Sequence, residues 1–205
     1  HLVVEEKCDG ANCAVSFNGA GELLLQSRGH YLTGGYREKH YDLFKQWATV
    51  HKDALWRVLG SRYILYGEWL YAKHTIYYNA LPHYFLEFDV LDRALDTFLD
   101  TNARRALLAG LPVVSAPVLA RGRFNDIESL TRLLGRSNFI TQGHMEQLER
   151  ECLRMGEDAT LRCAQTDPTQ MMEGLYIKVE EGGIVRARMK FVRPSFLQNV
   201  SLDDS

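Results

Sequence analysis

The sequence predicts an α+β fold in which mainly antiparallel sheets carry helices packed outside them. Short β-like runs alternate with amphipathic helical stretches along the 205 residues. The last clear pattern is a hairpin, with strands at 175–179 and 184–192 across a turn that contains Gly182 and Gly183. No glycine-rich phosphate loop leads from a strand into a helix, which argues against a Rossmann unit.

The first half of the chain predicts strands around a turn, then helices, then two longer strands. Apolar runs at 2–6, 13–18 and 23–25 are typical of strands, with glycines marking the turns between them. From 38 to 59, apolar residues recur at helical spacing, which predicts one or two amphipathic helices that end at Gly60. Strands are then expected at 63–71 and 84–91.

The second half predicts surface helices before the final hairpin. A helix is expected over 96–109, ending at Gly110 and Pro112. Another is expected after Asn125, which can cap it, and before Gly135. Residues 142–154 and the stretch after 157 are helical in pattern and highly charged, which indicates a solvated outer layer.

Composition limits the classes of protein that this chain can represent. Its length predicts one domain with a substantial core, and its formal charge of −2 means that nucleic acid must bind through local patches. No apolar run reaches the length of a membrane span, and no signal peptide is visible. The four cysteines lack C-x-x-C spacing, which favours free thiols in a reducing, cytoplasmic compartment over a zinc site. Because the chain opens on His1 inside a strand-like run, we expect a leading segment to be missing.

Residues 7–12, Lys-Cys-Asp-Gly-Ala-Asn, form the most informative motif. Lys7 ends an apolar run, and Asp9 and Gly10 supply the chemistry of a tight turn, which would present the amine to a cleft. A lysine nucleophile must be neutral, yet with a free pKa of about 10.4 only about 0.1% is neutral near pH 7.4. Nearby positive charge and partial desolvation would have to lower that pKa.

The second strand of the final hairpin can supply positive charge. With period-two alternation, Arg186, Arg188 and Lys190 share one face, and the apolar residues between them share the other. Such a cationic face would stabilise a phosphate during phosphoryl transfer. The alternative interpretation is an edge strand with solvated arginines.

Two carboxylates stand out by their surroundings. Glu68 lies in a strand rich in aromatic residues, so it is either paired and buried or directed at a ligand, with a plain surface carboxylate as the alternative. The neighbouring Gly67 would let a nucleotide approach the backbone. Glu173 opens the pattern Glu-Gly-x-x-x-Lys that ends at Lys178, and it is a candidate Mg²⁺ ligand. Strict alternation puts Glu173 and Lys178 on opposite sides unless a bulge or twist intervenes.

The ordered set of these motifs resembles the covalent nucleotidyltransferases, the superfamily of polynucleotide ligases and RNA capping enzymes. The motifs are the lysine turn, Tyr66-Gly67-Glu68, Phe88 in a Phe-Leu-Glu-Phe-Asp-Val strand, Glu173-Gly174 and Arg188-Met189-Lys190. With Asn12 and the Arg-x-Lys pattern, the chain is most similar to RNA ligases of the phage RNA ligase 2 type, from Glu5 to about Phe196. The resemblance implies a nucleotidyltransferase (ATP-grasp-like ligase) domain over 1–205, with no trailing OB domain and with any C-terminal domain removed or supplied by a partner.

The resemblance also implies a mechanism and its participants. Lys7 would attack the α-phosphate of ATP, the AMP would pass to a 5′-phosphate end, and a 3′-hydroxyl would displace it to seal the strand. The nucleic acid would be RNA, and the metal would be Mg²⁺, with Mn²⁺ as an alternative. The implied catalytic residues are Lys7, Glu173, Arg188 and Lys190, with Glu173 as the metal ligand. The implied nucleotide-binding residues are Glu6, Cys8, Asp9, Gly10, Asn12, Arg28, Glu68, Phe88 and Lys178.

Some of these roles have plain structural alternatives. Phe88 would stack on adenine by resemblance, whereas a phenylalanine in a strand is usually part of the core. Arg28 would contact phosphate, with an ordinary turn arginine as the alternative, and Asn12 could equally be a turn former. Glu68 would bind a ribose hydroxyl. Position 188 is an arginine where the family motif has a lysine, which fits a phosphate clamp.

Three other functions remain open from the sequence. A DNA ligase would normally carry an OB-fold domain after the last motif, and a capping guanylyltransferase would use GTP with the same lysine chemistry. A non-catalytic nucleotide- or RNA-binding module with the same fold is the alternative of a different class. The presence of Lys7, Glu68, Glu173 and Lys190 argues against it.

Overall fold

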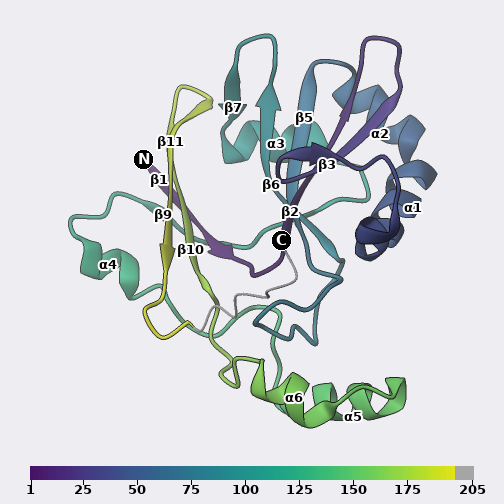
Figure 1. Ribbon diagram of the computed structural model, residues 1–205. Helices are drawn as coiled ribbons and strands as arrows, with labels where there is room; N and C mark the ends of the chain where they lie inside the picture. Colours follow the sequence, from purple (N-terminus) through teal and green to yellow (C-terminus); the bar gives the residue numbers. More distant parts are fainter. Residues whose placement is uncertain (197–205) are drawn as a thin grey trace.

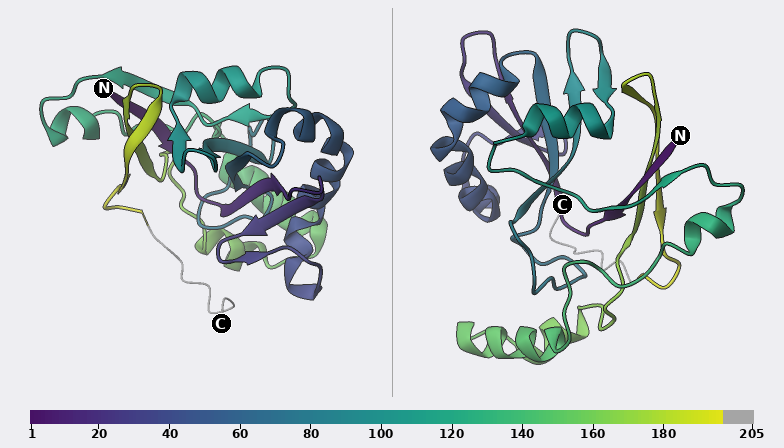
Figure 2. Two further views of the ribbon diagram at one scale, coloured as in Figure 1. Left: turned by 90° about the horizontal axis from the view of Figure 1, so that it is seen from above. Right: turned by 180° about the vertical axis from the view of Figure 1, so that it is seen from behind.

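A computed structural model describes residues 1–196 and confirms the predicted α+β class (Figure 1). The described strands form one mixed sheet in the order β4-β3-β2-β5-β6-β7-β11-β10-β1-β9, with β8 paired to β6. All of the pairings are antiparallel except that of β6 with β8. Helices lie outside the sheet, as the sequence predicts (Figure 2).

One part of the sheet carries the largest apolar core. Its strands are β2 (Ala11–Phe17), β3 (Leu23–Ser27), β4 (His30–Tyr31), β5 (Tyr63–Trp69) and β6 (Phe85–Asp92). The 3-10 helix η1 (Tyr36–Tyr41) leads into α1 (Asp42–Val50) and α2 (Lys52–Leu59). Phe44 and Leu55 from these helices pack with Phe17, Trp69 and Phe85 from the strands. Burial of these large side chains fixes the helices on the sheet.

The other part of the sheet is narrower and is apolar on its outer face. It consists of β1 (Leu2–Lys7), β9 (Val118–Gly122), β10 (Gly174–Glu181) and β11 (Ile184–Val192). The short helix α4 (Ile127–Thr131) covers that face (Figure 1). Val4, Leu175 and Ile177 form its core with Met172. The opposite face is therefore free to carry polar side chains.

Three short elements join the two parts, and two helices stand apart from them. The joining elements are β7 (Thr97–Leu99), α3 (Thr101–Leu108) and β8 (Val114–Ser115). Helices α5 (His144–Met155) and α6 (Ala159–Ala164) pack on each other at one end of the molecule (Figure 2). None of the described helices has the length and hydrophobicity needed to cross a bilayer.

The predicted elements are confirmed with corrections at their boundaries. The hairpin of β10 and β11 forms as expected. The predicted helix over 96–109 is wrong at its start, because Phe98 pairs with Leu91 and Val185 in β7. The helix α3 then begins after Asp100, whose carboxylate accepts a hydrogen bond from the Ala103 amide. The strands β4, β8 and β9 were not predicted.

The cap and the end of the next helix also differ from the prediction. Asp126, and not Asn125, caps α4 by accepting a hydrogen bond from the Ser129 amide at 2.7 Å. The helix ends at Thr131 instead of continuing to Gly135. A carboxylate at this position satisfies an amide that the helix cannot.

Gly174 is required by the close approach of β10 and β11. A Cβ atom added there would overlap the carbonyl oxygen of Phe191 and lie 3.0 Å from the Val192 Cα. We expect Gly174→Ala to lower the free energy of unfolding by more than about 2 kcal/mol, since overpacking against backbone forces the strands apart. Gly19→Ala, whose Cβ would meet nothing within 4 Å, is the control in urea unfolding. Equal stability of the two variants would contradict this account.

Candidate active site

Lys7 lies at the end of β1 and forms an ion pair with Glu173. Its Nζ is 2.6 Å from each carboxylate oxygen of Glu173. Lys7 stands opposite Gly174 in the β1–β10 register, and the Arg193 amide holds the carbonyl of Glu173 at 3.0 Å. The lysine is partly buried and the glutamate is buried. The structure therefore brings together the predicted nucleophile and the predicted metal ligand.

The turn after Lys7 is held in place by contacts of Asp9 and Gly10 with residues far along the chain. The Asp9 carboxylate accepts hydrogen bonds from the amides of Thr75 and Ile76, at 2.7 and 3.0 Å. The Asp9 amide donates to the Tyr78 hydroxyl at 2.7 Å. At Gly10 a Cβ atom would lie 2.7 Å from the Trp69 carbonyl oxygen, so only glycine fits. These contacts fix the direction in which Lys7 leaves the strand.

Glu68 approaches the same turn from β5. Its Oε1 accepts a hydrogen bond from the Gly10 amide at 3.2 Å, and Glu68 pairs with Asn12 across the strands. Desolvation raises the pKa of the Glu68 carboxyl to about 7, although the Lys7 charge lowers it. Burial also raises the pKa of Glu173, again against the effect of Lys7. The Lys7 amine thus lies beside the carboxyls of Glu68 and Glu173, which bind protons more readily than free carboxyls do.

The predicted approach of a nucleotide to the Gly67 backbone is wrong for the side of the strand on which a side chain would lie. A Cβ atom there would overlap the ring of Phe85, so that space holds core and not a nucleotide. The glycine allows the Phe85 ring to pack close to the β5 backbone, next to a register shift between Tyr66 and Gly67.

The inner face of β1, β10 and β11 carries the cationic side chains. In the register, Glu5 stands opposite Tyr176, which stands opposite Lys190. One step further along, Lys178 stands opposite Arg188. Directly paired residues in an antiparallel sheet point to the same side. The predicted common face is therefore confirmed for Arg188 and Lys190, and Phe191 packs in the core on the other face. Arg186 falls at the register shift between Val185 and Ala187 and has no partner in β10, so its place on this face stays a prediction.

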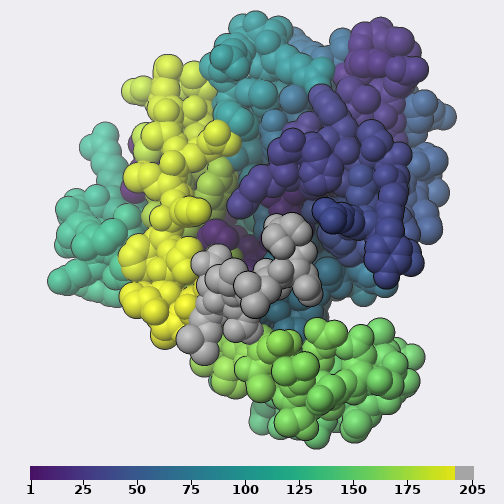
Figure 3. Space-filling model, viewed as in Figure 1, coloured from purple at the N-terminus to yellow at the C-terminus, as the bar shows by residue number. Residues whose placement is uncertain are grey.

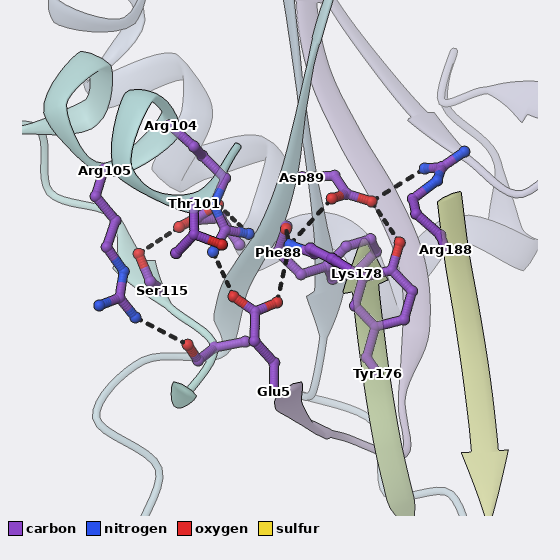
Figure 4. A network of polar contacts seen from close by, with 12 residues as sticks. Glu5, Phe88, Asp89, Thr101, Arg104, Arg105, Ser115, Tyr176, Lys178 and Arg188 are labelled. Carbon is purple, nitrogen blue, oxygen red and sulfur yellow. Dashed lines mark hydrogen bonds and ion pairs between the residues drawn. The ribbon is translucent and has the colours of Figure 1, made fainter. Parts of the chain in front are cut away.

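A network of charges lies buried under this face (Figure 4). The Lys178 Nζ is 2.9 Å from Glu5 and 3.1 Å from Asp89, and all three side chains are fully buried. The second oxygen of Asp89 accepts hydrogen bonds from the Tyr176 hydroxyl at 2.6 Å and from Arg188 at 3.0 Å. The Arg188 guanidinium also stacks on the Phe98 ring, 3.6 Å from its centroid. Arg188 is thus held in place while part of its guanidinium stays exposed.

Helix α3 closes the other side of the network. Arg104 is fully buried and contacts Glu5 and Glu87, the latter at 3.4 Å. The N-terminal residue of the helix, Thr101, donates from its amide and its hydroxyl to Glu180 on β10. The same set of charges therefore connects α3, β1, β6 and β10.

Lys178 and Glu173 have different partners, as strict alternation predicts. The register shift in β10 falls between Val179 and Glu180, beyond Lys178, and does not bring the two residues together. Lys178 is enclosed by protein, and its Nζ also donates to the Phe88 carbonyl oxygen. A nucleotide contact of Lys178 stays a prediction.

Three other predicted residues, Glu6, Cys8 and Phe88, have different surroundings. Glu6 is buried, and its carboxylate accepts hydrogen bonds from Ser137 and Asn138. Cys8 is buried in a small apolar cluster, which raises the pKa of its thiol. Phe88 is half-buried, with its ring edge-on to Tyr176 at a centroid distance of 5.5 Å.

Arg28 and Asn12 lie near the ends of two neighbouring strands, β3 and β2. Arg28 follows the last residue of β3, is exposed, and comes one residue after Ser27, which pairs with Cys13. Asn12 is half-buried on β2. Their nucleotide contacts stay predictions.

Sequence reasoning missed the acids and the tyrosine that organise the network. Glu5 lies in an apolar strand and Asp89 follows Phe88, and both are fully buried. Acidic residues inside apolar strands need partners, which is the signal that could have identified them. The partner Arg104 comes from a helix about 100 residues from Glu5, and Tyr176 from a strand further on. No local pattern connects such distant residues.

The candidate site has few potential metal ligands. Among residues 1–196, no cluster of three or more His, Cys, Asp or Glu side chains is arranged to hold a metal ion. The four cysteines are free, as the sequence predicts. A divalent ion at Glu173 would therefore need ligands from water or from a bound phosphate.

Lys178 tests the energetic importance of the buried network. We expect Lys178→Met to lower the free energy of unfolding by about 3–5 kcal/mol, because Glu5 and Asp89 lose a buried counter-charge. In the control, Arg154→Met removes an exposed ion pair with Glu151 and costs at most about 1 kcal/mol. Urea unfolding at neutral pH measures both. A loss at Lys178 no larger than that at Arg154 would argue against the network.

Glu68 predicts a dependence of stability on pH. Its carboxyl keeps a proton to about pH 7 in the folded protein, whereas an unfolded glutamate loses it near pH 4.5. The unfolded state binds fewer protons in that window, so the free energy of unfolding falls as pH rises from about 4.5 to about 7. Because Glu68 is half-buried, solvent screening limits its contribution to this change in the free energy of unfolding to roughly 1–2 kcal/mol.

The matching experiment compares urea unfolding at pH 5 and pH 8. In Glu68→Gln the loss of stability between the two pH values should be smaller than in the unaltered protein. Glu149→Gln, at an exposed position on α5, should leave that difference unchanged. The same difference in all three proteins would show that Glu68 ionises normally.

Comparisons with known proteins identify the fold and the family. A mutant Naegleria gruberi RNA ligase with ATP and Mn is 16% identical over 94% of this chain and 50% of its own, with a TM-score of 0.57. Another mutant, with AMP and Mn, is 16% identical over 93% of this chain and 49% of its own, with a TM-score of 0.58. The chain thus spans about half the length of these structures. No curated protein matches it.

The family assignment rests on a separate match. The family model for RNA ligases matches residues 1–192, which include the lysine turn, both carboxylates and the cationic strand. The match extends over nearly the whole chain of 205 residues. This protein belongs to the RNA ligase family.

Proposed function

We propose that this protein is an ATP-dependent RNA ligase in which Lys7 forms a covalent lysine–AMP intermediate. The observation that carries the proposal is the contact of Lys7 with Glu173 at 2.6 Å, next to Glu68 and to the cationic strand. Family membership supports ligase activity. The Naegleria gruberi structures with ATP and Mn support ATP and a divalent ion as the cofactors.

The amine must be freed from Glu173 before it reacts. Its Nζ lies 2.6 Å from a carboxylate oxygen of Glu173, and an amine held in such an ion pair has no lone pair for attack on phosphorus. Because burial raises the pKa of the Glu173 carboxyl, this carboxylate is suited to take the proton from Lys7. In this proposal the Lys7–Glu173 pair is a resting arrangement that nucleotide binding has to change.

The proposed reaction has three steps. The neutral Lys7 Nζ forms a bond to the α-phosphorus of ATP and gives up one N–H proton to solvent. The bond from that phosphorus to the bridging oxygen breaks, and pyrophosphate leaves. A 5′-phosphate of RNA then attacks the same phosphorus, and the amine leaves with a proton. Finally a 3′-hydroxyl attacks the activated 5′-phosphate, loses its proton, and releases AMP. Sealing thus forms one phosphodiester at the cost of one ATP.

Arg188 and Lys190 would bind the phosphates during these steps. Both lie on the inner face of β11, and Asp89 and the Phe98 ring hold the Arg188 guanidinium in position. A cation fixed in place stabilises the charge that develops on a transferring phosphoryl group without reorganising. Lys190 is exposed and close enough to Glu173 to affect its carboxyl electrostatically.

The residues present fit a magnesium or manganese ion bound together with the nucleotide. Mg²⁺ commonly takes one or two carboxylates, with phosphate oxygens and water as its other ligands. Glu173 would supply such a carboxylate next to Lys7 once it has released the Lys7 proton to solvent. The ion would offset phosphate charge when bound.

Radiolabelled ATP tests this function directly. We expect labelled ATP and Mg²⁺ to leave a label on the protein that survives a denaturing gel, because the phosphoramide bond is covalent. Lys7→Arg keeps the positive charge but cannot form the bond at neutral pH, so the label should disappear. Lys39→Arg, at an exposed position outside the turn, is the matched control and should keep the label.

The other outcomes identify the alternatives. Labelling by GTP but not by ATP would indicate a capping guanylyltransferase. A labelled protein that seals nicked DNA but not RNA would indicate a DNA ligase. No label with either nucleotide would contradict the proposed chemistry and favour a binding module.

A further inference from the structure

An exposed segment at 28–39 combines positive charge with aromatic rings. Arg28, Arg37 and Lys39 are exposed on it, and so are Tyr31 and Tyr36, at 53% and 82%. The Lys39 Nζ lies over the Tyr36 ring, 4.2 Å from its centroid. Among residues 1–196, neither the Arg28 nor the Arg37 side chain takes part in an ion pair. These cations are therefore available to a partner.

The acid in this segment points inward. The Glu38 carboxylate accepts hydrogen bonds from the amides of Thr33 and Gly34, at 3.3 and 2.9 Å. It also binds the Lys45 Nζ at 2.7 Å, and these contacts lower the pKa of its carboxyl. The acid thus shapes the loop while its charge is compensated from within. The outward face keeps an excess of positive charge on a chain whose formal charge is −2.

Both ends of the segment are anchored to the sheet. At one end β4 pairs with β3, and the Ser27 hydroxyl contacts the His30 ring. At the other end the Trp69 indole donates to the His40 carbonyl oxygen at 2.7 Å. The exposed rings and cations are therefore displayed on a fixed platform, which lowers the entropic cost of binding.

The segment begins beside the proposed nucleotide site. Ser27 pairs with Cys13, so Arg28 leaves the sheet next to Asn12, two residues from Gly10. A hollow of about 240 Å³ is lined by Gln26, Ser27, Gly29, His30 and Tyr31. In Figure 3 the dark blue residues of this region and the yellow strand β11 lie on the same face, on either side of a depression with purple atoms at its base.

We propose that the 28–39 segment binds a single-stranded portion of the RNA substrate next to the Lys7 site. Exposed aromatic rings stack with unpaired bases of any sequence, and arginine and lysine bind the intervening phosphates. Bases within an A-form duplex are not open to such stacking, which favours a single strand. This inference rests on the proposed ligase function, because it takes RNA as the substrate.

The test measures binding of a 5′-phosphorylated, 12-nucleotide single-stranded RNA at several salt concentrations. We expect Tyr36→Ala to weaken binding about 5- to 150-fold, the equivalent of one stacked base, and Tyr36→Phe to bind normally. Arg37→Gln with Lys39→Gln should lower the slope of log affinity against log salt by about 1.4. Lys52→Gln with Arg57→Gln, exposed cations on α2, should change neither affinity nor slope.

Two results would contradict the proposed RNA binding. Binding of the Tyr36→Ala and Arg37/Lys39 variants within twofold of the unaltered protein overturns it, as does stronger binding to a blunt RNA duplex. Thermal unfolding of each variant shows whether it remains folded, and Tyr36→Phe separates the ring from the fold. Labelling by ATP without RNA is measured in the same samples. Loss of RNA binding in an unlabelled protein would retain this inference and reject the ligase chemistry.

Discussion

The buried charges of Glu5, Asp89 and Lys178 are the constraint on which the rest of the structure depends. They lie where β1, β6 and β10 meet, and none of them can lose a partner without leaving a desolvated charge. Lys7 comes from β1 and Glu68 from β5, which pairs with β6. The relative position of these two reactive groups is therefore set by the network and not by the turn alone.

The Lys7–Glu173 contact explains how a lysine can rest safely in a partly buried site. The buried Glu173 carboxylate binds the Lys7 amine, so a ligand would have to compete for one of them before the proposed reaction could begin. The same carboxylate, with its raised pKa, is a ready proton acceptor. In the proposed reaction, resting protection and activation would use one pair of residues. Arg188, the proposed phosphate clamp, is paired instead with its own acid, Asp89.

Local patterns predicted much of the fold, and long-range contacts account for what they missed. Alternation and turn glycines predicted the final hairpin and the strand that ends at Lys7, because neighbouring residues determine both. Residues 97–99 were expected to be helical, but pairing with β6 and β11 overrode that local pattern. Within the site, the turn motif predicted Lys7 and Gly10. The burial of Lys178 depends on Glu5 and Asp89, which approach it only after folding.

The two cationic surfaces of the molecule differ in how their charge is balanced. Arg188 faces Asp89, so its field is largely compensated and acts on a ligand in direct contact. Arg28 and Arg37 have no ion-pair partner within residues 1–196, and Glu38 beneath them is bound to Lys45. Uncompensated charge acts over about 8 Å at physiological salt, which is enough to attract a polyanion before contact. A strand captured at 28–39 would then lie beside Asn12, at the end of the turn that begins with Lys7, the residue proposed to carry the adenylate.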